Sequence, residues 1–257
     1  MEKNNSQTGR QQLPADEKFN FACHSKVKCF NRCCHNADMY LYPYDIIRLK
    51  NRLGISSDKF LKEQTISAFR DDSPYFPHVM LRMSDNEDKA CRFLSEEGCK
   101  IYEDRPFSCR AYPLEPAVSR VEDQEIENIY FINRHEHCLG HNESRKWTAE
   151  EWIKDQEIET YIAMNAHWVE MDSLFRQSPW GKPGTASQPL KMAFMACYNA
   201  DKFREFVLGS SFLKRFQIPD ERREKIKSDD VELMLFGFKW VKFFLTGKGD
   251  FQKAAQD

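Results

Sequence analysis

The chain has 257 residues, of which 41% are hydrophobic and 30% charged, a composition that is typical of folded globular proteins and excludes wholesale disorder. Its 38 basic and 40 acidic residues leave a formal net charge of -2, so no overall positive field favours nucleic acid as a partner. The nearest approach to a membrane span, residues 233–245, is interrupted by Lys239 and Lys242 and is shorter than the roughly 20 apolar residues that cross a bilayer. We therefore expect no membrane span.

Residues 1–18 are polar and contain no aromatic side chain, which predicts a disordered leader. They include no apolar run that could serve as a signal peptide. We therefore expect a cytoplasmic protein, in which thiols stay reduced unless a metal binds them.

Residues 19–141 carry most of the cysteines and only short periodic segments, which predicts a small, irregular domain of short helices and strands. The apolar spacing in residues 42–54 favours a helix that ends at Gly54. A second helix is expected to follow, with Ser57 and Asp58 as its caps. Short strands are predicted at three places, with a turn over residues 95–98 between the second strand and the next cysteine. These strands are expected over residues 79–84, 91–94 and 129–132.

Further along, Pro106 fits the first turn of a short helix. Such a helix would place Cys109 near backbone N–H groups, which stabilise thiolates. From residue 142 to 257 the pattern becomes helical. Thr148 and Glu151 form a capping box at the start of one long helix, which we expect to run to a break at residues 178–184.

Two later apolar segments, residues 203–216 and 231–245, complete the predicted helical part. We expect this helical region, residues 142–257, to be the surface that docks a protein partner. The predicted fold class is therefore α+β, with an irregular cysteine-rich metal-binding domain followed by a helical C-terminal part.

Eight of the nine cysteines lie between residues 23 and 138, which indicates a metal-binding region. One soft metal ion needs four thiolates, so eight indicate two tetrahedral sites or iron–sulfur chemistry. A disulfide framework is the alternative, but a reducing compartment and a chain long enough for an ordinary core argue against it. Cys197 is expected to be a small buried apolar side chain. The candidate ligands are Cys23, Cys29, Cys33, Cys34, Cys91, Cys99, Cys109 and Cys138.

Cys33 and Cys34 are adjacent, and in an extended segment their side chains would point to opposite sides, so they can serve different metals or need a turn to serve one. Nearby basic residues would offset the thiolate charge, nearby aromatic residues would limit solvent access, and nearby histidines are alternative zinc ligands or outer-shell residues. The basic residues are Lys26, Lys28, Arg32, Arg92, Arg105 and Arg110; the aromatic residues are Phe93, Tyr102, Phe107 and Tyr112; the histidines are His24, His35, His135, His137 and His141.

The segments FACHSKVKCFNRCCHNADMYLYPYDIIRLKNRLGISSDKFL and CRFLSEEGCKIYEDRPFSCRAYPL resemble the YkgJ-like cysteine-cluster family of zinc- or iron-chelating domains. The resemblance covers residues 21 to about 140 and includes all eight clustered cysteines and an RP-x-x-CR-x-YP segment. It implies metal binding. The spacers after Cys23 and Cys29 are longer than in the usual CxxCxxCC pattern, which leaves the sharing of ligands between sites open.

Three classes of function follow. The first is a metal-binding protein that holds a 4Fe–4S cluster or zinc in a structural or electron-transfer role. Eight thiolates with an aromatic shell favour iron slightly, and the absence of CxxC lowers the zinc-finger interpretation. The second is an enzyme similar to flagellin lysine-N-methylases, which the resemblance implies, although neither a C-x3-C-x2-C nor a GxGxxG motif is present. The third is a zinc-stabilised interaction module.

Overall fold

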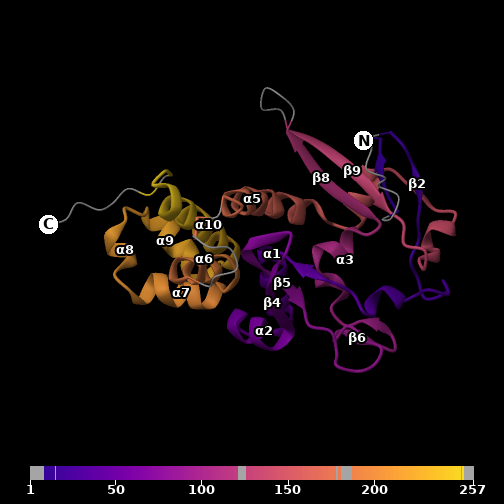
Figure 1. The fold of residues 1–257 in the computed structure, drawn as a ribbon, viewed down its shortest axis with the longest axis horizontal. Helices are drawn as coiled ribbons and strands as arrows, with labels where there is room; N and C mark the ends of the chain where they lie inside the picture. The colour runs from indigo at the N-terminus through magenta and orange to yellow at the C-terminus, as the bar shows by residue number, and fades with distance from the viewer. Residues whose placement is uncertain are drawn as a thin grey trace. The chain divides into compact units, whose positions relative to one another are not determined.

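The computed structural model describes residues 9–14, 16–120, 126–177, 179–180, 187–249 and 251. Short antiparallel strands and a helical C-terminal part make it an α+β protein, as predicted (Figure 1). The strands are β1 (Arg10–Leu13), β2 (Phe19–Asn20), β3 (Tyr40–Leu41), β4 (Thr65–Arg70), β5 (Ser73–Leu81), β6 (Leu94–Ser95), β7 (Gly98–Cys99), β8 (Leu114–Arg120), β9 (Ile126–Asn133) and β10 (Lys146–Trp147).

The helices are longer on average in the C-terminal part of the chain. The α-helices are α1 (Pro43–Leu53), α2 (Ser57–Gln64), α3 (Phe107–Ala111), α4 (Ala149–Asp155), α5 (Glu159–Phe175), α6 (Gln188–Tyr198), α7 (Ala200–Gly209), α8 (Phe212–Arg215), α9 (Asp220–Ser228) and α10 (Asp230–Thr246). The 3-10 helices are η1 (Arg32–Cys34), η2 (Tyr102–Asp104) and η3 (Leu139–Asn142).

The chain folds into two compact units, and each is made of two separate segments. Unit 1 comprises Met1–Met39 and Met83–Ile162, and unit 2 comprises Tyr40–Arg82 and Ala163–Asp257. The expected domains, 19–141 and 142–257, were continuous in sequence. The composition change near residue 141 does not coincide with this division, because composition does not record which distant segments pack together.

The largest sheet of unit 1 has the strand order β1-β9-β8, with antiparallel pairing throughout. Figure 1 shows β8 and β9 as its two long neighbouring strands. The predicted strand at 129–132 lies within β9. β1 pairs with β9 from Arg10 opposite Asn133 to Leu13 opposite Tyr130, so the expected disordered leader is wrong for residues 10–13. Residues 1–8 and 15 of that leader lie outside the described residues.

The core of unit 1 is rich in aromatic residues and binds the segments next to Cys23 and Cys109. The indole N–H of Trp147 donates to the carbonyl of Phe21 at 2.8 Å, and that of Trp152 donates to the carbonyl of Ala111 at 2.8 Å. Burying two indoles without partners would be costly, so these bonds fix both segments against the core. The buried members are Leu13, Phe19, Phe21, Ala111, Leu114, Ile132, Trp147, Ala149, Trp152, Ile153 and Ile158.

The capping box predicted at Thr148 and Glu151 is present at the start of α4. The single long helix predicted after it is wrong, because α4 ends at Asp155 and α5 begins at Glu159. Between them Glu157 has a φ of 51°, a left-handed conformation that an α-helix cannot contain. The helical segment was predicted to end before the break at residues 178–184, and α5 does end before it, at Phe175. Residues 178 and 181–184 of the predicted break lie outside the described residues.

Unit 2 combines the sheet β3-β5-β4 with most of the long helices. Phe76 of β5 stacks on Phe175 with ring centroids 4.2 Å apart. α1 ends at Gly54 as predicted, and Gly54 has the left-handed φ of 62° that such a position requires. The cap of α2 is Ser56 rather than Ser57 or Asp58, because the Ser56 hydroxyl accepts from the Lys59 N–H.

The two later helical segments are confirmed as α7 and α8, and as α10. α10 packs closely on α6, where Gly237 lies against the carbonyl of Ala196. Cys197 of α6 is 4% exposed, which confirms the expected buried apolar role. Within the described ranges, none of the helices combines the length and apolar character needed to cross a membrane.

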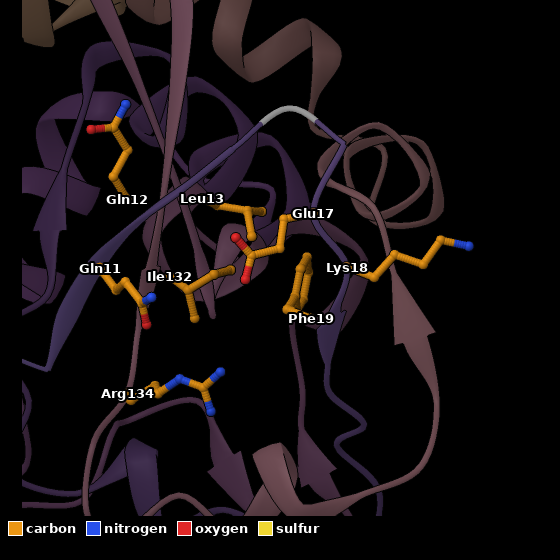
Figure 2. Close-up of a pocket in the computed structure, with 8 residues that line it drawn as sticks. All are labelled: Gln11, Gln12, Leu13, Glu17, Lys18, Phe19, Ile132 and Arg134. Carbon is orange, nitrogen blue, oxygen red and sulfur yellow. The ribbon is translucent and has the colours of Figure 1, made fainter.

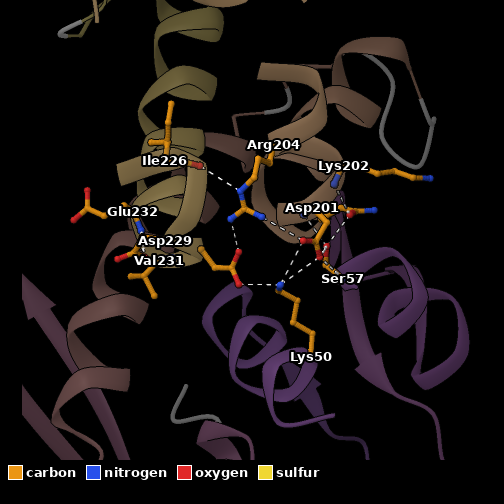
Figure 3. A network of polar contacts seen from close by, with 11 residues as sticks. Lys50, Ser57, Asp201, Lys202, Arg204, Ile226, Asp229, Val231 and Glu232 are labelled. Carbon is orange, nitrogen blue, oxygen red and sulfur yellow. Dashed lines mark hydrogen bonds and ion pairs between the residues drawn. The ribbon is translucent and has the colours of Figure 1, made fainter. Parts of the chain in front are cut away.

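A buried ionic network joins four helices of unit 2 (Figure 3). The Lys50 ammonium lies 2.8 Å from Asp230 and 3.3 Å from Asp201, and the side chain of Lys50 is only 8% exposed. Arg204 contacts the same two carboxylates, at 2.5 Å and 3.3 Å. Asp201 also accepts hydrogen bonds from the backbone N–H and hydroxyl of Ser57 at 2.6 Å and 2.9 Å. Each buried charge is therefore paired.

Candidate metal centre

The eight clustered cysteines all lie in unit 1, whereas Cys197 lies in unit 2. Residues 40–82 separate the two cysteine-rich stretches in the sequence but belong to unit 2. The two stretches nevertheless fold into the same unit. The described cysteines are thiols rather than disulfides. Most lie on turns, short helices or strand ends, where loops can aim several sulfurs at one point.

Cys33 and Cys34 lie in the 3-10 helix η1 and not in an extended segment. Such a helix has three residues per turn, so adjacent side chains still diverge around its axis. Asn31 and Asn36 flank the pair with φ values of 66° and 49°. Asparagine tolerates this left-handed conformation better than most residues, which allows the chain to turn sharply on both sides of the pair.

The second cysteine-rich stretch runs antiparallel to the residues that follow η1. The N–H of Cys91 donates to the carbonyl of Cys34 at 2.7 Å, and the N–H of Asn36 donates to the carbonyl of Lys89 at 2.9 Å. Isolated bridges join His35 to Ala90 and Met83 to Cys91. The strand predicted over residues 79–84 is the end of β5, which begins earlier, at Ser73, and stops at Leu81; of the strand predicted over residues 91–94, only Leu94 lies in a strand, β6. This pairing joins Cys91 to the adjacent pair.

A small hairpin presents Cys99. β6 and β7 pair Leu94 with Cys99 across the turn that was predicted over residues 95–98. Gly98 has a φ of 121°, which favours glycine, and lies against the ring of Phe30. The hairpin therefore packs on the loop between Cys29 and Cys33.

Cys109 lies in α3, the short helix predicted after Pro106. Its thiol lies 3.5 Å from the sulfur of Met39. Arg110, the next residue, is 5% exposed, and its guanidinium donates to the carbonyls of Gln156, at 2.6 Å, and Glu103. Arg110 therefore fixes α3 to the residues between α4 and α5.

Cys138 caps η3 and is joined to the first stretch by two contacts. The N–H of Leu139 donates to the sulfur of Cys29 at 3.1 Å. Gly140 fits so closely that an added Cβ would lie 2.7 Å from the carbonyl oxygen of Ala22. These contacts place Cys138 beside Cys29 and next to the residue that precedes Cys23.

The Tyr112 hydroxyl lies beside Cys138. From the sequence, Tyr112 was predicted only as part of an apolar shell around the sulfurs. It forms a hydrogen bond with the Cys138 thiol and lies 3.3 Å from Nε2 of His141. Burial and the Cys138 thiolate raise the pKa of Tyr112 above its ordinary value, so the phenol stays protonated and able to donate. The YP of the RP-x-x-CR-x-YP segment was the sequence signal for this residue.

The electrostatic neighbours of the thiols form two groups of four. An ionised thiolate raises the pKa of a thiol only when the two lie close together. Such effects link Cys23, Cys29 and Cys138, and they link Cys34, Cys91, Cys99 and Cys109. Cys33 acts on Cys23 and Cys138, and with these three residues it is named the Cys33 group; the other four are named the Cys34 group. Cys33 also acts on Cys34, Cys91 and Cys99, so it lies where the two groups meet.

The adjacent pair has opposite shifts in pKa. A hydrogen bond from Cys34, supported by the His35 and Arg105 charges, lowers the pKa of Cys33 to about 6 against partial burial. The same hydrogen bond raises the pKa of Cys34, and burial and the nearby thiolates add to this effect. Partial burial and the thiolates of its group raise the pKa of Cys23 to about 11. Crowded thiols resist ionising together unless a cation balances them.

Backbone N–H groups face several of the sulfurs. Burial raises the pKa of Cys91, Cys99 and Cys138, but N–H groups two or three residues further along oppose this shift. These donors belong to Phe93 and Leu94 for Cys91, to Ile101 for Cys99, and to Gly140 for Cys138. Such donors stabilise metal thiolates, so the donor set fits a soft metal.

As they stand, no three cysteine, histidine or acidic side chains of the described ranges converge closely enough to hold an ion. The five histidines do not join the cysteine groups as further ligands in this arrangement. His24 lies 3.6 Å from Glu143, and His135 and His137 stack on each other at the surface. The fit to a metal rests on the number, softness and grouping of the sulfurs.

A small pocket beside β1 in unit 1 is the wrong size for an organic substrate (Figure 2). Its volume is about 20 Å³, which is room for about one water molecule, whereas ligand pockets usually exceed about 300 Å³. It is lined by Gln11, Gln12, Leu13, Glu17, Lys18, Phe19, Ile132 and Arg134.

Comparison with known families agrees with the geometry. The family model CxxCxxCC, described as "Putative zinc- or iron-chelating domain", matches residues 22–147, just under half of the chain. The cysteine-rich region belongs to this family. The matched range contains all eight cysteines of the two groups and ends at Trp147 in the core of unit 1. No curated protein and no solved structure matches the chain.

Proposed function

We propose that unit 1 is a metal-binding domain in which the Cys33 group and the Cys34 group each bind metal through four thiolates. The observation that carries this proposal is a pair of contacts between the cysteine-rich stretches: the N–H of Leu139 donates to the sulfur of Cys29, and the N–H of Cys91 donates to the carbonyl of Cys34. Four thiolates complete one tetrahedral zinc site or ligate one iron–sulfur cluster. Cys33, at the junction, would couple the two sites.

The surroundings of the sulfurs support metal binding over a cluster of ordinary thiols. Backbone N–H groups face four of the sulfurs, those of Cys29, Cys91, Cys99 and Cys138. These donors suit thiolates, which accept hydrogen bonds and bind metal, better than neutral thiols. Burial and the repulsion of neighbouring thiolates raise the pKa of Cys23, and a bound cation would remove that repulsion.

The proposed role is structural or electron-transferring. Unit 1 joins its cysteine loops by few regular hydrogen bonds, so metal binding would contribute much of the free energy that orders them. Zinc would make the role structural, and an iron–sulfur cluster would add electron transfer. The family description allows either metal.

Counting reactive thiols tests the proposal. In the purified full chain, bound metal should protect the eight cysteines from a thiol reagent, and a strong chelator should expose all eight. A Cys197→Ala variant should give the same change, because Cys197 is buried in the other unit. Eight thiols that react equally fast with and without the chelator would refute the proposal.

A further inference from the structure

A segment of unit 2, residues 40–82, interrupts the cysteine-rich part of the chain. The chain leaves unit 1 after Met39 and returns to it at Met83. The N–H of Cys91 nevertheless donates to the carbonyl of Cys34, although about 56 residues lie between these two cysteines. Bringing two points of a free chain together costs entropy, and this cost rises with the length of the loop between them.

Regular strand pairing joins the two ends of the segment 40–82 within unit 2. β3 pairs antiparallel with β5, and Tyr40 at the start of the segment lies opposite Met80 near its end. β5 is the central strand of this sheet and also pairs with β4. The N–H of Arg82 donates to the carbonyl of Gln64 at 2.8 Å. The segment is therefore a closed loop when unit 2 is folded.

Packing within unit 2 stabilises this closure without the cysteine groups. Leu41 and Val79 lie opposite each other on β3 and β5, and they are only 2% and 1% exposed. Phe76 of β5 stacks on Phe175 of α5. The ion pairs of Lys50 join α1, which follows β3, to α7 and α10. Because all of these residues belong to unit 2, the closure forms without a metal.

We propose that folded unit 2 promotes metal binding in unit 1 by closing the chain between Cys34 and Cys91, an inference that rests on the proposed function. Through the paired strands β3 and β5, the path between the two cysteines has only about 17 residues instead of about 56. Loop closure becomes less favourable as about the 3/2 power of loop length, so the shorter path favours metal binding about sixfold. The two connecting segments transmit this effect, so it requires no contact between the units.

Insertion of flexible Gly/Ser segments into the full chain tests the inference. The test site lies between Glu87 and Asp88, in an exposed turn after β5, where an insertion lengthens the path that the strands leave open. The control site lies between Asp71 and Asp72, in the exposed turn from β4 to β5, where an insertion lengthens only the closed loop. Titration of the metal-free, reduced protein with Co²⁺ measures affinity, because Co²⁺ bound by four thiolates has a characteristic visible absorption.

Insertions of about 20 and about 40 residues at the test site should weaken Co²⁺ binding about threefold and about sixfold, because the open path grows to about 37 and about 57 residues. The same insertions at the control site should change the affinity less than about 1.5-fold, since the paired strands bypass them. Circular dichroism checks that the helices remain. A control variant that loses them is replaced by an insertion after Gly54, between α1 and α2.

Two results would overturn the inference. Equal weakening at the test and control sites would show that unit 2 does not close the chain. Equal weakening by the shorter and longer insertions at the test site would show local damage to the turn, because an entropic effect must grow with length. Absence of thiolate absorption in the wild-type chain would instead refute the proposed function.

Discussion

Cys33 and Cys34 are neighbours on one turn of η1, yet Cys33 acts on thiols in both groups, whereas Cys34 is affected by its own group and by Cys33. Cys33 acts on Cys23 and Cys138 as well as on Cys91 and Cys99, and Cys34 is affected by Cys91 and Cys109. Each group draws sulfurs from both cysteine-rich stretches of the chain. A metal in either group would therefore tie distant segments of unit 1 together.

Replacing one member of the adjacent pair should separate the two groups. Cys34→Ser should remove about half of the bound metal, because one tetrahedral site loses a thiolate while the other keeps four. Cys33→Ser should remove at least as much, because Cys33 lies at the junction. Metal analysis of the purified variants measures this directly. Cys197→Ala is the control, and a metal content that stays at the wild-type value in both serine variants would contradict the two-group arrangement.

Tyr112→Phe should weaken metal binding without unfolding unit 1. The change deletes the hydroxyl that bonds to Cys138 and keeps the ring, which packs edge-on to Phe21 with centroids 5.6 Å apart. Losing an outer-shell hydrogen bond should lower metal affinity about 10–100-fold, measured by competition with a chelator. Tyr130→Phe is a matched control, because Tyr130 packs on the same core. Equal affinities in the two variants would show that the hydroxyl does not support the centre.

Gly140→Ala should destabilise unit 1 by steric crowding. Its Cβ would lie 2.7 Å from the Ala22 carbonyl oxygen and 2.8 Å from the Phe21 ring, both fixed in the structure. We expect a loss of about 1–3 kcal/mol in the free energy of unfolding, measured with denaturant. Gly209→Ala is the control, since nothing lies within 4 Å of its added Cβ and alanine favours the helix. Equal stability of the two variants would contradict the close approach of η3 to residues 21–22.

Unit 2 should lose stability in acid through its ionic network. Burial alone would raise the pKa of Asp230 and Asp201, but hydrogen bonds and ion pairs with Arg204, Lys50 and Ser57 outweigh it and lower both values. A lowered folded-state pKa stabilises the protein above the unfolded value of about 4, and this contribution is lost as the pH falls below it. Denaturant unfolding between about pH 7 and pH 3 measures the slope, which Asp230→Asn should reduce.

Lys50→Met tests the same network at neutral pH. It removes the cation between two partly buried carboxylates, and breaking a buried ion pair costs about 3–5 kcal/mol. The matched control is Lys202→Met, whose partner Asp58 is largely exposed, so its loss should be small. Equal losses in the two lysine variants would show that burial of Lys50 does not matter.

Features that depend on near neighbours in sequence were predictable. The end of α1 at Gly54 and the capping box at Thr148 follow from local conformational preferences, and both are present. The break at Glu157 was not predictable, because the apolar stripe continues across it. Gln156 in that break is fixed by bonds to arginines that lie far away in sequence.

The site was predictable as a set of sulfurs but not as an arrangement. Cysteine number and softness identified the ligand candidates, and the adjacent pair suggested two sites. The sequence could not show that residues 40–82 leave the cysteine-rich unit, because that depends on long-range packing. The position of Tyr112 beside the sulfur of Cys138 depends on tertiary contacts of the same kind.

The most direct test of the account is metal and sulfide analysis, with a visible spectrum, of the full chain purified without air. We predict stoichiometric metal bound by thiolates: either about two zinc ions in a colourless protein, or iron with acid-labile sulfide in a brown one. Folded protein that contains neither metal, and that takes up none when zinc or iron and sulfide are supplied, would contradict it.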